Sequence, residues 1–230
     1  ALALVRFCQT PGHGYAQSTA AMYAMHVYQL RRETAEAGRW AEITLELAEQ
    51  QGYLYNIAFA QVVKGWACAR QGAGEQGLKL IREGLAAAGA IGAKLDRPYF
   101  LALAAEAQLE CGAVGSALES VESALRLIED GRTFFYEAEL YRLRAAVRRA
   151  GDPVAAGPAE EDLARAFAVA QRQGAKLLEL RVACDLLELR AGRAGREAAA
   201  EQVRWLYASF QEGCATPDLV RAWRLAGGRM

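Results

Sequence analysis

The sequence predicts an all-α protein, an α-solenoid built from about five antiparallel helix pairs and closed by a short C-terminal helix. Glycines recur about every 20 residues along most of the chain. Between them lie stretches rich in Ala, Leu, Glu and Arg, in which apolar residues follow helical spacing. Strand signals, such as alternating runs of Val, Ile and Thr, are almost absent. A regular alternation of helix and turn is typical of helical repeats.

The glycines fall into two alternating series, each with a step of roughly 40 residues. Glycine adopts the left-handed conformation that ends a helix, so each glycine is expected to close one helix. The first series comprises Gly38, Gly72, Gly112, Gly151 and Gly192, and the second Gly52, Gly92, Gly131, Gly174 and Gly213.

These boundaries predict two sets of helices. The first helices of the pairs are expected near 16–37, 54–71, 97–111, 133–150 and 175–191, and their partners near 40–51, 75–90, 114–129, 159–173 and 196–212. A last helix is expected from Thr216-Pro217-Asp218, where Thr can cap and Pro suits the first turn. Residues 1–15 are interpreted as the remnant of a preceding helix plus a turn, and 16–230 as one repeat domain. The chain starts in mid-pattern without Met, which suggests a segment of a longer protein.

Composition and charge argue against several classes of function for this chain. Hydrophobic residues make up 53% of the chain, and 27 basic residues balance 27 acidic ones. A neutral chain lacks the basic footprint of a nucleic-acid or anionic-membrane binder, and no apolar run reaches the roughly 18 residues of a membrane span. A local basic patch has Glu137 and Glu139 one helical turn away, so no nucleic-acid site is expected there; it comprises Arg142, Arg144, Arg148 and Arg149. No signal peptide is recognised.

Catalytic and cofactor signals are weak. Residues 72–77 read G-x-G-x-x-G, but a helix is expected before them where a nucleotide loop needs a strand, and no Gly-Lys-Ser/Thr ending follows. His13 and His26 are the only histidines, too few for a triad or a metal cluster. We therefore expect no catalytic residues, no metal and no cofactor. The five well-separated cysteines indicate reduced, mostly buried thiols in a cytoplasmic protein.

A charged residue stands two positions before each glycine of the first series. It is expected at the C-terminal end of each first helix, near the concave face of the stack. The helix dipole favours Arg there and disfavours Glu, so Arg70 or Arg149 should compensate a neighbouring Glu. Two interpretations stay open: a ladder of exposed ion pairs, or a charged groove that selects a peptide or domain. The residues are Glu36, Arg70, Glu110, Arg149 and Arg190.

Aromatic and charged residues on the same predicted face extend this candidate site. Such side chains are common anchors of protein partners. For Trp66 and Tyr99 the alternative is that they pack between adjacent repeats. The predicted partner-binding residues are Tyr28, Arg32, Glu36, Trp66, Arg70, Tyr99, Glu106, Glu110, Tyr141 and Arg149.

Helix pairs at this period are compatible with tetratricopeptide and HEAT/armadillo repeats. Small residues at the expected crossing points favour the tetratricopeptide form, whose stack is right-handed; they include Ala117, Ala124, Ala164 and Ala166. Several segments also resemble, in the same order, a tetratricopeptide-like region at the C-terminus of bacterial adenylate/guanylate cyclase and AAA-like ATPase signalling proteins. They are QLRR at 29–32, GWA at 65–67, DRPYFLAL at 96–103, YEAELYRL at 136–143, AQRQGAK at 170–176, FQEG at 210–213 and TPDL at 216–219.

The resemblance implies a regulatory role within such a protein, although Cys68 and Gln108 stand where a Trp is common in tetratricopeptides. The expected function is a non-catalytic protein–protein interaction module that binds a protein or peptide, including the parent protein's own ATPase or cyclase domains. The alternative is a small-molecule sensor domain, as in transcription-activator-like signalling ATPases, which requires an enclosed apolar pocket. An enzyme has hardly any support in the sequence.

Overall fold

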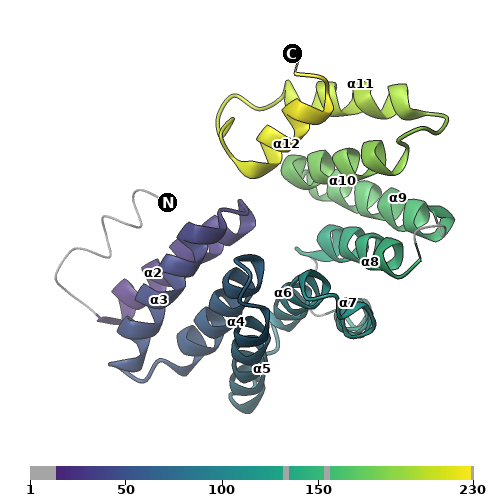
Figure 1. Cartoon of the computed structure of the whole chain (residues 1–230). Helices are drawn as coiled ribbons and strands as arrows, with labels where there is room; N and C mark the ends of the chain where they lie inside the picture. Colours follow the sequence, from purple (N-terminus) through teal and green to yellow (C-terminus); the bar gives the residue numbers. More distant parts are fainter. Residues whose placement is uncertain (1–13, 132–134, 153–155, 229–230) are drawn as a thin grey trace. The chain divides into compact units, whose positions relative to one another are not determined.

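The computed structural model describes residues 14–131, 135–152 and 156–228, and within these ranges it contains eleven α-helices and no strand. Consecutive helices pack as antiparallel pairs, which confirms the predicted all-α class (Figure 1). The contacts divide the chain into two compact units, residues 1–133 and residues 134–230. The predicted remnant helix and turn fall largely on residues 1–13, outside the described residues; the assignment of 16–230 to one domain stays a prediction.

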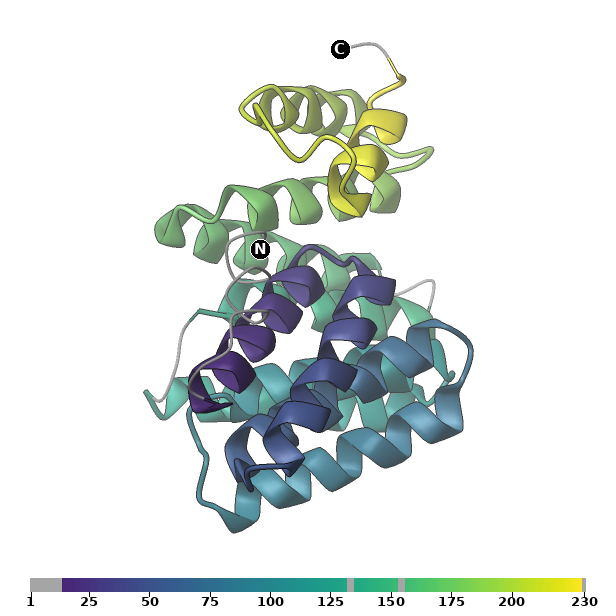
Figure 2. The same ribbon diagram turned by 90° about the vertical axis from the view of Figure 1, so that its left-hand side faces the viewer.

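Unit 1 contains three helix pairs. Each helix packs against the next, and the first helices of the pairs also contact one another (Figure 2). The pairs are α2 (Gly14–Leu30) with α3 (Thr34–Glu49), α4 (Leu54–Arg70) with α5 (Gly74–Ala90), and α6 (Arg97–Glu110) with α7 (Val114–Glu129).

Unit 2 contains two further pairs and the short closing helix. In this unit α10 is central, since it contacts every other helix. The helices are α8 (Glu137–Gly151), α9 (Ala156–Gln173), α10 (Lys176–Leu189), α11 (Arg196–Tyr207) and α12 (Pro217–Leu225). The predicted C-terminal helix is therefore present, but the Thr216 hydroxyl donates to the Gly213 carbonyl (2.7 Å) and does not cap α12.

Most helices are followed, as predicted, by a glycine in the left-handed conformation. Gly72 has φ 92°, and the next residue, Ala73, donates its N–H to the carbonyl of Cys68 (2.9 Å). This is the hydrogen bond of a Schellman end, which satisfies a carbonyl that the helix leaves open. Ala113 repeats it toward Gln108 (2.8 Å). The glycines with positive φ include Gly52, Gly72, Gly92, Gly112, Gly131, Gly174, Gly192 and Gly213.

The first predicted boundary is wrong. Helix α2 ends at Leu30, not near 37, and α3 begins at Thr34, not near 40. Gly38 lies inside α3, where a Cβ would come within 3.2 Å of the Ala67 Cβ, so its smallness serves close helix packing. The left-handed position at the end of α2 belongs to Arg32, whose φ is 59°. A prediction based on glycines alone therefore missed the end of α2, which an arginine closes.

Candidate partner-binding surface

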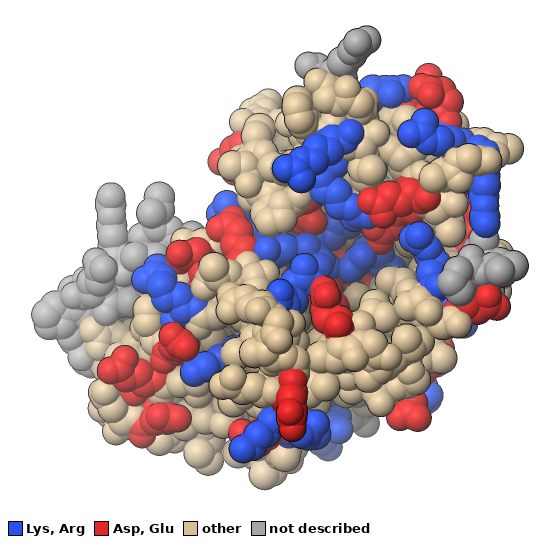
Figure 3. All heavy atoms as spheres, in the orientation of Figure 1, with Lys and Arg blue, Asp and Glu red and all other residues tan. Residues whose placement is uncertain are grey.

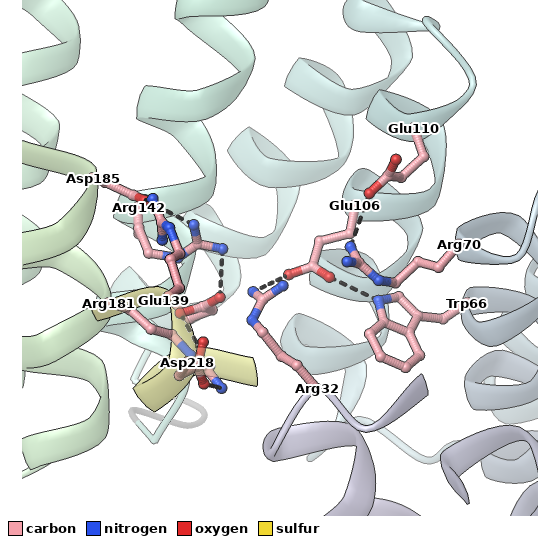
Figure 4. Close-up of polar contacts among 11 residues, drawn as sticks. Arg32, Trp66, Arg70, Glu106, Glu110, Glu139, Arg142, Arg181, Asp185 and Asp218 are labelled. Carbon is pink, nitrogen blue, oxygen red and sulfur yellow. Dashed lines mark hydrogen bonds and ion pairs between the residues drawn. The ribbon is translucent and has the colours of Figure 1, made fainter. Parts of the chain in front are cut away.

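Three of the predicted site residues form one buried polar contact in unit 1. The Arg32 guanidinium donates to one carboxylate oxygen of Glu106 (Nη2 to Oε1, 2.8 Å), and the Trp66 indole N–H donates to the other (Nε1 to Oε2, 2.7 Å) (Figure 4). The Trp66 side chain is fully buried, and Glu106 is only 5% exposed. A buried carboxylate needs such partners, because unpaired burial of a charge is very costly.

The repeat brings these groups together. Trp66 and Glu106 lie one 40-residue period apart, at equivalent positions of the neighbouring helices α4 and α6. Arg32 reaches Glu106 from the left-handed end of α2, so one carboxylate links all three first helices of unit 1. These three residues join the helices of the scaffold, and Trp66 fits the packing alternative rather than an exposed anchor.

A second polar pair lies closer to solvent. Arg70 Nη1 donates to Glu110 Oε1 (2.8 Å), which confirms the expectation that Arg70 compensates Glu110 at the end of α6. The side chains are 28% and 46% exposed, and the Arg70 guanidinium lies 5.5 Å from the centroid of the Trp66 ring. An ion pair this exposed contributes about 0–1 kcal/mol. Both charged groups of this pair remain accessible to a partner.

Tyr99 is part of a buried aromatic cluster. Its hydroxyl donates to Gln29 Oε1 (2.7 Å), and its ring lies 4.9 Å from His26 and 5.7 Å from Phe59, centroid to centroid. Burial lowers the pKa of His26, and the nearby Asp96 offsets this only in part, so the imidazole is neutral at pH 7. Tyr99 is fully buried, as the packing alternative requires.

The remaining predicted residues do not join these contacts. Glu36 lies in the first turn of α3, not at the end of a first helix, and pairs with Arg39 (2.8 Å). The helix dipole favours a carboxylate at that end, so no compensating Arg70 is needed.

Tyr28 is half-buried on α2. Tyr141 and Arg149 lie on α8 of unit 2; Tyr141 is half-buried under the Arg144 guanidinium (5.1 Å to the ring centroid), and Arg149 is partly exposed.

Unit 2 contains a buried ion network that the sequence analysis missed. Arg142 bridges Glu139 (2.7 Å) and Asp185 (2.8 Å), and Arg181 binds Asp218 (2.6 Å) (Figure 4). The network joins α8, α10 and α12. A signal was present, since Arg181 and Asp185 stand four residues apart within the otherwise apolar middle of α10. Charges at such positions must be paired to be buried.

The charges of this network favour a role in stabilising the fold over a role of Asp185 in proton transfer. Burial would raise the pKa of Asp185, but Arg142 and Arg221 hold it below its ordinary value. Arg221 donates to Asp185 Oδ1 (2.5 Å) and, despite burial, its own pKa is raised by Asp185 and Glu188. A carboxylate held so firmly in its charged form is a poor general base near pH 7.

The basic run of α8 is similarly occupied. Arg144 and Arg148 both bind Asp162 of α9 (2.7 Å each), and Arg142 belongs to the buried network. On the face drawn in Figure 3, acidic and basic side chains lie next to one another in both units. This distribution does not resemble the basic stripe of a nucleic-acid binder.

Other candidate chemistry receives little support. The G-x-G-x-x-G segment spans the turn after α4 and the first residues of α5, and Gly77 packs so closely that a Cβ there would lie 2.5 Å from the Gly65 carbonyl oxygen. Within residues 14–131, 135–152 and 156–228, no three His, Cys, Asp or Glu side chains gather as metal ligands. None of the helices in those ranges is long and apolar enough to cross a lipid bilayer.

The thiols differ from expectation. Of the four cysteines in the described ranges, only Cys184 is buried, which raises its pKa to about 12. Cys68 is half-buried, and Cys111 and Cys214 are exposed. The prediction of mostly buried thiols is thus wrong for this part of the chain. Cys111 follows the end of α6 and Cys214 lies in the connection between α11 and α12, so neither lies on the apolar helix faces that cover Cys184.

No protein-family model matches the chain. It is similar to an uncharacterized protein of Rhizobium meliloti (strain 1021), with 28% identity over 194 residues. The aligned region covers 81% of this chain but only 18% of the Rhizobium protein, so the chain spans less than a fifth of its relative. Because the identity is low and the match covers a small part of a long protein, this comparison assigns no function to the chain.

Two cavities lie at the surface of unit 1, with volumes of about 230 Å³ and 170 Å³. The larger lies between α3 and α4, and the smaller between α5, α6 and α7. Both are smaller than the roughly 300–1,000 Å³ of typical small-molecule sites. The enclosed apolar pocket that a metabolite sensor requires is not among these two, because both open to solvent.

Proposed function

We propose that this chain is a non-catalytic protein–protein interaction module that binds a peptide or a protein domain. The observation that carries the proposal is the accessible Arg70–Glu110 pair, which lies over the buried Trp66–Glu106–Arg32 contact. The buried contact fixes the ends of α4 and α6, and so holds a charged surface in one geometry. Fixing a binding surface in advance lowers the entropy cost of association.

The wider role proposed is regulatory. The resemblance of residues 29–219 to the C-terminal region of bacterial cyclase and ATPase signalling proteins supports a cytoplasmic tetratricopeptide-like module that contacts the ATPase or cyclase domain of its parent. A long relative of which the chain covers 18% is compatible with that arrangement. The small-molecule sensor has less support, because the two cavities of unit 1 are small and open.

A charge-swap series tests the surface. Arg70→Glu and Glu110→Arg each break the pair, and the double variant R70E/E110R restores it in reverse. Binding of the immobilised chain to purified ATPase and cyclase domains of the same gene would be followed by biolayer interferometry. If the pair contacts the partner, the double variant regains wild-type stability but still binds at least about tenfold more weakly, the effect of one lost charged contact.

The other results are equally clear. Recovery of binding by the double variant would mean that the pair only stabilises the helices. Wild-type affinity in all three variants would exclude this surface, and no binding to either domain would overturn the proposed regulation of a parent ATPase or cyclase. Circular dichroism of each variant separates these results from unfolding.

A further inference from the structure

The two cavities of unit 1 are equivalent grooves of successive repeats. A shift of 40 residues relates four lining residues of the first to four of the second: Gly38 to Leu78, Glu42 to Arg82, Lys64 to Ala104 and Cys68 to Gln108. Each groove lies where a second helix meets the first helix of the next pair. The chain therefore offers its own internal comparison of one groove with the other.

The first groove contains charged side chains that pair with one another. Lys64 Nζ on α4 lies 3.4 Å from Glu42 Oε1 on α3, so an ion pair spans the groove. Arg39, on the same wall, is paired with Glu36. The charged side chains of its lining, Arg39, Glu42 and Lys64, thus already have ion-pair partners.

In the second groove that ion pair is missing. Arg82 replaces Glu42, and Ala104 replaces Lys64, so the cation faces a methyl group across the groove. Arg82 is exposed and, among the described residues, has no carboxylate within ion-pair distance. The Arg82 guanidinium is therefore left available at the edge of the groove.

The rest of the second groove is divided into an apolar and a polar wall. Leu78, Ile81 and Leu85 follow one face of α5 and pack against Ala104. Opposite them lie Ser116 and Ser120 of α7 with Gln108 of α6, and Ser120 and Gln108 are hydrogen-bonded to each other (2.8 Å). One wall can contact an apolar side chain while the other offers polar groups to a peptide backbone.

We propose that this groove docks a peptide segment of the partner that places one large apolar side chain beside a carboxylate. The inference rests on the proposed interaction function and names the chemistry of its partner. A volume of about 170 Å³ suits a single branched or aromatic side chain, since a cavity of about 150 Å³ holds benzene. The carboxylate pairs with Arg82 and takes the place of the charge partner that Lys64 provides to Glu42 in the first groove.

The test uses the full chain and fluorescein-labelled heptapeptides, each with one central Leu and one Asp at a position from three residues before to three residues after it. Fluorescence anisotropy gives the affinity of each peptide and of its Asp→Asn counterpart. At least one register should bind about tenfold more tightly than its Asn counterpart, the gain of one well-placed charged pair. Replacement of the Leu by Ser should abolish binding.

Two matched pairs of variants locate the site. Arg82→Glu should weaken the best peptide at least about tenfold, whereas Lys79→Glu, on the same helix but outside the groove lining, should leave it unchanged. Ser116→Trp fills the groove from an exposed position, while Gly115→Trp places the same ring where a Cβ meets nothing within 4 Å. Only the former should block binding.

Equal binding of the Asp and Asn peptides in every register, or wild-type affinity in both Arg82→Glu and Ser116→Trp, would overturn the groove assignment. Binding to purified ATPase or cyclase domains would still support the interaction function in that case, because those domains would then dock elsewhere. Peptide binding without domain binding would retain the groove and reject the parent domains as its partner.

Discussion

Arg32 holds a left-handed backbone conformation at the end of α2, the position that glycine occupies at the end of α4 and α6. For a residue with a Cβ this conformation costs about 1–2 kcal/mol. The cost is offset because from here the guanidinium binds Glu106, which is almost fully buried. Loss of one partner of a buried pair costs about 3–5 kcal/mol, so the ion pair outweighs the strain.

Replacement of Arg32 by Gly should therefore destabilise the protein, although it relieves the strained backbone. We expect a loss of about 1–4 kcal/mol at pH 7, measured by urea denaturation, which is the ion-pair loss less the relieved strain. In a Glu106→Gln background the same replacement should cost much less, because no buried charge is left unpaired. An equal loss in both backgrounds would show that Arg32 acts through other contacts.

The Asp185 carboxylate makes stability depend on pH. Its folded pKa lies below its ordinary value of 3.8 because Arg142 and Arg221 outweigh the effect of burial. Its contribution to stability is thus complete above the ordinary pKa and is lost as pH falls from that value through the lower pKa of the folded state. Asp185→Asn should cost about 3–5 kcal/mol at pH 7, and the gap to wild type should narrow below about pH 4.

The measurement is urea denaturation between pH 3 and pH 7. Glu119→Gln removes an exposed carboxylate and serves as the control, with little change at any pH. A gap for Asp185→Asn that stays constant down to pH 3 would contradict the assigned ion pairs.

At the scale of single residues, the sequence predicted what the repeat period alone determines. Arg70 and Glu110 stand 40 residues apart, and the structure pairs them as expected. Glu36 was misplaced because its position was counted from Gly38, which is not a helix end. The buried role of Glu106 was not predictable from charge alone, since most Glu residues on Ala-rich helices face solvent.

At the scale of helices, α4 and α5 make the closest packing in unit 1. Cβ atoms added at Gly65 and Gly77 would each lie 2.5 Å from the other residue's carbonyl oxygen, and one at Gly84 would lie 2.8 Å from the Ala58 oxygen. Glycines inside helices normally cost stability because they add backbone freedom to the unfolded chain. Here Gly65, Gly77 and Gly84 allow two backbones to touch, which gives the last glycine of the G-x-G-x-x-G pattern a packing role.

Gly77→Ala should accordingly destabilise the protein by about 1–3 kcal/mol, the usual cost of overpacking a tight contact. Gly115→Ala is the matched control, because that helical glycine is exposed and its added Cβ meets nothing within 4 Å. The control should gain about 0.5–1 kcal/mol from helix propensity alone. Thermal or urea denaturation compares the two, and a gain in both would show that α4 and α5 can move apart without cost.

Helix α12 covers Cys184. Its residues Leu219 and Ala222 share one apolar cluster with the thiol, and burial raises the Cys184 pKa to about 12. Since the thiolate is the reactive form, iodoacetamide at pH 8 should label Cys184 far more slowly than Cys111. Leu219→Ala, which loosens α12, should speed labelling of Cys184 at least about tenfold by its effect on local opening.

Peptide mass mapping follows each thiol separately, and the exposed Cys111, whose rate should not change, is the internal control. Labelling of Cys184 as fast as Cys111 in the unaltered protein would mean that α12 is not docked in solution.

Helix boundaries were predictable wherever a glycine adopts the left-handed conformation, as at the ends of α4 to α7. The sequence failed at α2, where Arg32 takes that role through a tertiary ion pair that no local pattern encodes. The buried network of α8, α10 and α12 was missed for the same reason. Its partners on different helices are 36–43 residues apart, and their pairing depends on how the helices pack.

At the scale of the whole molecule, a single period organises unit 1, where Arg32, Gly72 and Gly112 mark successive turns 40 residues apart. The same shift relates the two grooves, so a change of charge at equivalent positions replaces the ion pair of the first groove with a single cation in the second. The class of fold follows from this periodicity. The partner does not, because recognition depends on the few surface residues in which the repeats differ.

The division into two units leads to a last prediction. Unit 2 has apolar clusters of its own: Leu180, Leu187, Val203, Leu206 and Leu219 in one, and Leu163, Val182 and Leu186 with Ala145 in another. Its ion network is also internal, since Arg142, Asp185 and Arg221 all belong to it. A fragment of about 100 residues with its own core can fold alone.

Residues 134–230 expressed alone should therefore give a helical circular dichroism spectrum and a cooperative urea transition. Leu206→Ala within the fragment should lower its stability by about 2–5 kcal/mol, as expected for truncation in a packed core. A fragment with a random-coil spectrum would show that this core requires residues before 134. A helical fragment without a cooperative transition would show that its helices form but do not pack as described.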